Sequence, residues 1–137
     1  MDFKVKHLEM ILSLISRVSS NSFFLKGWSL TLIAGVFALS AKDANDYLYL
    51  FSFVPILLFW FLDSYYLQLE RKYRCLFNSV LLKKPEEIDF RLDITSSNAT
   101  EGTLFCQCLL SKTELWFYFP LALLVGLILI ISFSAAV

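Results

Sequence analysis

The sequence predicts an all-α integral membrane protein with three transmembrane helices, an N-terminal amphipathic helix, and a second span that continues into the cytoplasm as a stalk. Of its 137 residues, 58% are hydrophobic and only 18% are charged, with a mean hydropathy of +0.65. A soluble domain of this length is seldom so apolar. The charged residues are also segregated between three long apolar runs. We therefore expect four regions: an amphipathic helix (1–21), a transmembrane hairpin (22–66), a cytoplasmic stalk and loop (67–112), and a C-terminal transmembrane helix (113–137).

The first region predicts an amphipathic helix that is too short and too charged to span a membrane. Its apolar residues recur at steps of three and four: Leu8, Ile11, Ile15 and Val18. Such a helix either lies in the membrane interface or packs against another cytoplasmic helix. Because Glu9 and Arg17 interrupt the apolar run, the stretch does not resemble a signal peptide, and we expect the N-terminus to be retained.

The first transmembrane helix is predicted over 23–41, after four residues that are typical of helix N-caps, Ser19-Ser20-Asn21-Ser22. One face of this helix carries small residues at steps of four, three and four: Gly27, Thr31, Ala34 and Ala38. Small residues let two helices approach closely in lipid, so the face predicts helix packing. A pore lining is the alternative interpretation.

The stretch from Tyr47 to Leu82 has no internal turn signal and predicts one helix of about 54 Å, at about 1.5 Å per residue. Because the hydrocarbon core is only about 30 Å thick, the apolar half should span it and the charged half should continue into water. Pro55 lies in the span, where it removes one backbone hydrogen bond.

The charged half of this helix carries a heptad stripe: Leu62, Tyr66, Leu69, Tyr73, Leu76 and Val80. The stripe predicts packing on the N-terminal helix or on a neighbouring subunit. Lys83 and Lys84 should complement the helix C-terminus before Pro85 ends it.

Residues 86–103 read as a cytoplasmic segment, because Ile88, Phe90, Leu92 and Ile94 alternate with polar residues as in an extended strand. The glycosylation pattern at Asn98 is attributed to chance. Ser111-Lys112-Thr113-Glu114 then predicts a capping box before the last span, Leu115 to Val137, which contains no charge.

The distribution of lysine and arginine predicts the orientation. With three spans, eleven of the twelve basic residues fall on the N-terminal side of the membrane and only Lys42 on the other. This places the N-terminus in the cytoplasm and the C-terminus outside. Lys26 and Asp63 then lie at similar depths near the inner ends of the first two spans. They either form an intramembrane ion pair or each point toward the headgroups.

The sequence offers no catalytic, cofactor or metal site. No nucleophile set or phosphate-binding loop is present, and we do not expect an enzyme. Cys75, Cys106 and Cys108 are expected to be free thiols, since Cys106 and Cys108 lack the second ligand pair of a zinc site. The remaining candidate contacts are basic residues that could meet headgroups or nucleic acid, although such residues most often determine topology: Arg71, Lys72, Arg74, Lys83 and Lys84.

Three stretches, NSFFLKGWSLTLIAGVFALSAKDAN, FWFLDSYYLQLERKYRCLFN and LLSKTELWFYFP, resemble a family of small bacterial membrane proteins of anti-phage defence loci, typified by the membrane effectors of Hailong systems. The resemblance covers most of the chain apart from 86–103, and LKGW and LDSYYLxxERxYR are its specific parts. It implies an oligomeric ion channel that depolarises the inner membrane. It also implies gating by single-stranded nucleic-acid oligomers that a partner nucleotidyltransferase makes.

The physical interpretation agrees with oligomerisation, since three spans cannot enclose an aqueous pathway alone. We therefore expect a homo-oligomeric ion channel in the bacterial inner membrane. The competing function is a membrane anchor that presents its cytoplasmic helices to a partner enzyme and conducts nothing.

Overall fold

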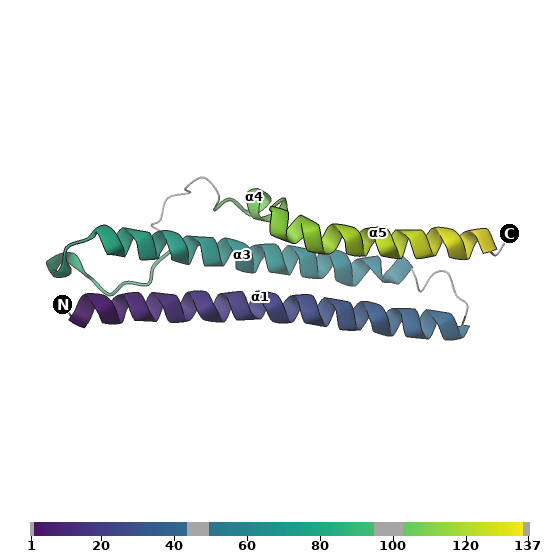
Figure 1. Ribbon diagram of the computed structural model, residues 1–137, viewed down its shortest axis with the longest axis horizontal. Helices are drawn as coiled ribbons and strands as arrows, with labels where there is room; N and C mark the ends of the chain where they lie inside the picture. Colours follow the sequence, from purple (N-terminus) through teal and green to yellow (C-terminus); the bar gives the residue numbers. More distant parts are fainter. Residues whose placement is uncertain (1, 44–49, 95–102, 136–137) are drawn as a thin grey trace.

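The computed structural model describes residues 2–43, 50–94 and 103–135. These residues form four α-helices, named as in Figure 1, and one short 3-10 helix: α1 (Asp2–Asp43), α3 (Phe53–Leu82), η1 (Pro85–Glu87), α4 (Phe105–Leu109) and α5 (Lys112–Ala135). In Figure 1, α1 and α3 run antiparallel and α5 lies along the N-terminal half of α3. Two helices, Phe3–Ser40 and Lys112–Ser134, are long and apolar enough to cross a membrane. The all-α prediction is confirmed for the described residues, whereas the third span stays a prediction.

The N-terminal region differs from the prediction, because the expected two helices form one. α1 is continuous for 42 residues, or about 63 Å at about 1.5 Å per residue. The Ser19–Ser22 run is helical throughout and caps nothing. The reason lies in the buried stripe, which stops at Val18 and resumes in phase at Ser29, eleven residues or about three turns later. Its members are His7, Ile11, Ile15, Val18, Ser29, Ile33 and Ser40. The buried hydroxyls of Ser29 and Ser40 donate to the carbonyls of Lys26 and Val36, at 2.8 and 2.9 Å, so they need no other partner.

The long helix predicted from Tyr47 ends at Leu82 as expected, but α3 begins only at Phe53. The sequence predicts a short connection over 42–46, but Lys42 and Asp43 belong to α1; residues 44–49 lie outside the described residues. Ser52 forms a turn before α3. Leu50 and Phe51 are helical as well, and Pro55 has no N–H to donate to the carbonyl of Phe51, four residues earlier, so the helix is interrupted at this turn. The proline therefore occupies the first turn of α3, where helices tolerate it.

The N-terminal part of α1 packs on the C-terminal part of α3. Ile11, Ile15 and Val80 form a buried core, which partly buried apolar side chains extend: Leu8, Tyr73, Leu76, Phe77 and Leu92. Of the two alternatives for the amphipathic stretch, the structure shows packing on the protein. The predicted heptad stripe contributes Tyr73, Leu76 and Val80 to this core. At its other end Leu62 is 37% exposed, and the adjacent Asp63 is buried instead.

After η1, segment 88–94 returns over α1. The ring of Phe90 lies 5.3 Å from that of His7 and 6.3 Å from that of Phe3, between centroids. Phe90 itself has a φ of 53°, an unusual value for a non-glycine residue, at the bend of the segment. Ile88 is extended, but the described segment 88–94 contains no strand, and the positive φ of Phe90 interrupts the extended conformation that the sequence predicts. Residues 95–102, with the sequon at Asn98, lie outside them.

The C-terminus of α3 is capped by the opposite end of the chain. Lys4 Nζ donates to the carbonyls of Leu81 and Lys83, at 2.9 and 2.8 Å. Lys83 is the C-cap residue of α3 and Lys84 follows it, so the role predicted for these two lysines stays a prediction, whereas the observed hydrogen bonds to the last carbonyls come from Lys4. Antiparallel packing brings Lys4 to these carbonyls, where a cation also complements the helix dipole.

α4 was not predicted, and it attaches the start of α5 to the middle of α3. Trp60 Nε1 donates to the carbonyl of Leu109 at 3.1 Å, and Gln68 Nε2 donates to the carbonyl of Thr103 at 2.8 Å. The rings of Phe61 and Phe105 lie 4.7 Å apart between centroids. These contacts fix where α5 begins relative to α3.

Candidate functional site

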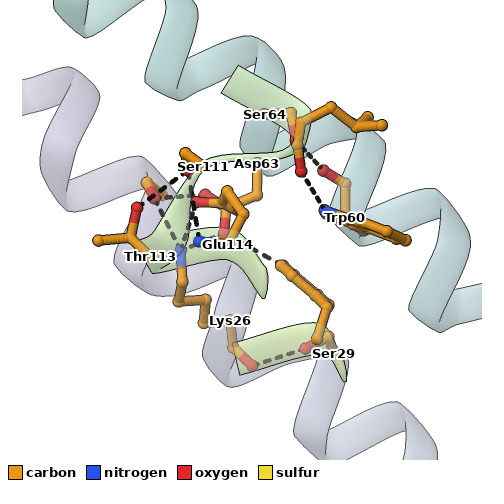
Figure 2. A network of polar contacts seen from close by, with 11 residues as sticks. Lys26, Ser29, Trp60, Asp63, Ser64, Ser111, Thr113 and Glu114 are labelled. Carbon is orange, nitrogen blue, oxygen red and sulfur yellow. Dashed lines mark hydrogen bonds and ion pairs between the residues drawn. The ribbon is translucent and has the colours of Figure 1, made fainter. Parts of the chain in front are cut away.

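The three long helices meet in an apolar core whose central residues are Ile33, Ile56, Tyr118 and Val125. Ionisable side chains lie at the end of this core where α5 begins. We call these residues the polar cluster: Ser22 and Lys26 of α1, Asp63 of α3, and Glu114 and Tyr118 of α5. Figure 2 shows Lys26, Asp63 and Glu114 converging from the three helices. The cluster is the main polar feature among the described interior residues.

Asp63 is the centre of the polar cluster and is fully buried. Its carboxylate forms an ion pair with Lys26 Nζ. It also accepts hydrogen bonds from the hydroxyl of Ser22 and, at 3.2 Å, from that of Tyr118. A buried carboxylate requires such partners, because isolated burial of a charge is very costly. The structure therefore brings together Lys26 and Asp63, the two charges that the sequence placed at similar depths.

Glu114 enters the polar cluster from the first turn of α5, where it is 2% exposed. Half of the predicted capping box is present, since the Glu114 N–H donates to Ser111 Oγ at 3.4 Å. The glutamate side chain turns away from Ser111, and its Oε1 lies 3.3 Å from Lys26 Nζ. The ammonium charge offers a stronger interaction than a backbone amide, which explains the departure from the capping box.

Lys26 forms ion pairs with the carboxylates of both Asp63 and Glu114. Its side chain is 24% exposed, and its Nζ lies 5.7 Å from the centroid of the Phe117 ring. One ammonium faces two carboxylates, so the cluster carries one excess negative charge if both are ionised. Chemically, the cluster joins three helices through charge-assisted hydrogen bonds inside an otherwise apolar core.

The small residues that the sequence assigned to packing or a pore do not pack within the chain. Gly27, Thr31, Ala34 and Ala38 are all exposed, and a Cβ placed on Gly27 would meet nothing within 4 Å. These residues are two positions out of phase with the buried stripe of α1. Two residues correspond to about 200° around a helix of 3.6 residues per turn, which puts the small residues on the opposite side. They form the outward face of α1.

The candidate anion-binding residues lie on the C-terminal half of α3 and just beyond its end. Arg74 pairs with Glu70, with Nη2 2.8 Å from Oε1, and Arg71 is hydrogen-bonded to Cys108 of α4. Lys83 and Lys84 follow the end of α3, roughly 14 Å further along the helix axis than Arg74, at about 1.5 Å per residue. The structure therefore distributes these charges along the stalk.

The three cysteines, all among the described residues, form no disulfide bond and lie in different environments. Cys106 is exposed and Cys108 is buried, and burial raises the pKa of the Cys108 thiol while the nearby Arg71 charge opposes that rise. Among the described residues, no group of three or more His, Cys, Asp or Glu side chains could hold a metal ion.

Comparisons of the chain with protein-family models, curated proteins and solved structures find no match. Sequence reasoning missed three members of the polar cluster: Ser22, Glu114 and Tyr118. The available signal was the step of four from Glu114 to Tyr118, which places both side chains on one face of the last helix. The fold and the polar cluster define an all-helical protein with two candidate membrane-spanning helices.

Proposed function

We propose that this chain is a bacterial anti-phage membrane effector that assembles through the outward face of α1 into a homo-oligomeric ion channel of the inner membrane. The observation that carries the proposal is the exposure of Gly27, Thr31, Ala34 and Ala38. In lipid, burial of apolar surface does not drive helices together, so association depends on close packing. Small residues permit that close packing. The face is free within one copy of the chain, so a second copy can occupy it.

A single copy offers no route for ions through its centre. The three-helix interior is filled by large apolar side chains, among them Ile33, Ile56 and Tyr118. An aqueous pathway therefore has to form between copies. Thr31 already donates to the Gly27 carbonyl at 3.0 Å, so its hydroxyl is satisfied either beside a pore or against a neighbouring helix.

Three spans are supported by the position of α3. Its apolar half supplies Ile56, Phe59 and Trp60 to the same core as the two candidate spans, which supports a third span beside them. With this arrangement the bias of basic residues puts the N-terminus in the cytoplasm and the C-terminus in the periplasm. The packed pair of α1 and α3 then extends beyond the bilayer as a cytoplasmic stalk.

The stalk would carry the gating signal, which the family resemblance identifies as a single-stranded oligonucleotide made by a partner nucleotidyltransferase. α1 and α3 each continue without interruption from the stalk to the polar cluster. A change at the stalk surface can therefore reach the membrane through two rigid helices. Depolarisation of the inner membrane would follow from channel opening.

Purified protein in liposomes tests the proposal. We expect the wild type to be oligomeric and to pass ions, with a flux that changes when single-stranded oligonucleotide is added. Ala34→Phe fills the outward face and should abolish both assembly and flux. Leu32→Phe adds volume at another exposed position of α1 and should preserve both. A wild type that assembles but passes no ions with or without oligonucleotide would favour the non-conducting anchor.

A further inference from the structure

We propose that the polar cluster binds one exchangeable proton, held on Glu114, so that α5 enters the core with a neutral carboxylic acid. The first observation is the charge balance of the cluster. Asp63 and Lys26 form a complete ion pair, with Asp63 further stabilised by the hydroxyls of Ser22 and Tyr118. An ionised Glu114 would add a second negative charge that no other cation in the cluster balances.

The second observation is the Glu114 side chain itself. It is 98% buried, since its exposed fraction is 2%, and its Oε2 makes no hydrogen bond within the described part of the chain. A buried carboxylate oxygen without a partner is among the costliest arrangements in a protein interior. A proton on Glu114 removes the charge and with it most of that cost.

The helices around Glu114 provide few groups that would stabilise its ionised carboxylate. Lys26 of α1 is already paired with Asp63 of α3, and Asp63 repels a second carboxylate. α4 contributes the buried thiol of Cys108, which lies within electrostatic range of Glu114, and α5 itself contributes Tyr118. Arg71 of α3 interacts with that thiol, and Lys72 lies within electrostatic range of it. The positive group in contact with Glu114 is the shared ammonium of Lys26, 3.3 Å from Oε1. Around one ammonium that is already paired with Asp63, a second negative charge on Glu114 is disfavoured.

This inference does not depend on ion conduction, and it is tested on the purified protein in detergent. Infrared spectroscopy should show the carbonyl stretch of a protonated carboxylic acid at neutral pH, and the band should shift in deuterium oxide. The band should be absent from Glu114→Gln and retained in Glu87→Gln, which removes an exposed carboxylate. It should also disappear from the wild type as the pH is raised.

A second measurement uses stability, because glutamine resembles the protonated acid in shape and charge. We expect Glu114→Gln to melt at the wild-type temperature, while Asp63→Asn melts well below it. A folded wild type without the infrared band would overturn the proposal, as would a band that persists in Glu114→Gln. So would a melting temperature that rises with sodium or potassium at constant ionic strength in the wild type but not in Glu114→Gln, since a cation would then balance the charge.

Discussion

Replacing Asp63 by asparagine removes the charge at the centre of the polar cluster while keeping the size of the side chain. Breaking a buried ion pair costs about 3–5 kcal/mol. The lower end applies here, because Lys26 is 24% exposed and Glu114 Oε1 lies 3.3 Å from its ammonium. Once the Asp63 charge is removed, Glu114 can lose its proton and act as the counter-ion. We expect a loss of about 3 kcal/mol in the free energy of unfolding. At about 3 °C per kcal/mol for a chain of this length, the melting temperature should fall by about 10 °C.

The assay is thermal unfolding in detergent, followed by intrinsic tryptophan fluorescence. Asp89→Asn is the matched control, because Asp89 is half exposed and its ion pair with Arg91 has a separation of 3.8 Å. Such surface pairs contribute about 0–1 kcal/mol, so this variant should melt close to the wild type. The double variant Lys26→Met/Asp63→Asn should lose less stability than the sum of the single changes. Equal melting temperatures for Asp63→Asn and Asp89→Asn would refute the structural role of the cluster.

Three further outcomes follow from the fold. Lys4→Met should lower the free energy of unfolding by about 1 kcal/mol and speed amide exchange at the end of α3. Lys6→Met, at an exposed position, should change neither quantity. Equal exchange in both variants would exclude the Lys4 cap. A maleimide should modify Cys106 before Cys108, because Cys108 is buried and burial raises the pKa of its thiol. Mass spectrometry of the labelled peptides measures the order, and earlier labelling of Cys108 would contradict the prediction. Ser20→Pro should cost about 3 kcal/mol, since it interrupts a continuous α1, while a helix that began near this serine would tolerate it.

The helical class and the end of α3 could be predicted because they depend on local composition. The continuity of α1 could not. Ser19 to Ser22 favour helix caps when they are considered alone, since their side chains compete for backbone hydrogen bonds. Packing of Ile11, Ile15 and Val18 against α3 supplies the tertiary stabilisation that carries the helix through them.

The candidate site was partly predictable for the same reason. A charged residue within an apolar run needs a partner or a headgroup contact, so the sequence indicated Lys26 and Asp63 as a candidate ion pair. Glu114 sits at a position where a capping box already explains it, and its contact with Lys26 depends on the docking of α5 by α4 and Trp60. The sequence also did not show that the small-residue face points away from the other helices, because the buried stripe of α1 includes serines as well as large apolar residues.

The channel proposal rests on the proposed three-span arrangement, and cysteine accessibility tests that arrangement most directly. In a variant whose three native cysteines are replaced by serine, Ala44→Cys, which lies between α1 and α3 in the sequence, and Ser79→Cys, in the last turn of α3, report on the two sides of that helix. A membrane-impermeant maleimide applied to spheroplasts should label Ala44→Cys at once and Ser79→Cys only after permeabilisation. Labelling of both positions from the same side would show that α3 does not cross the membrane.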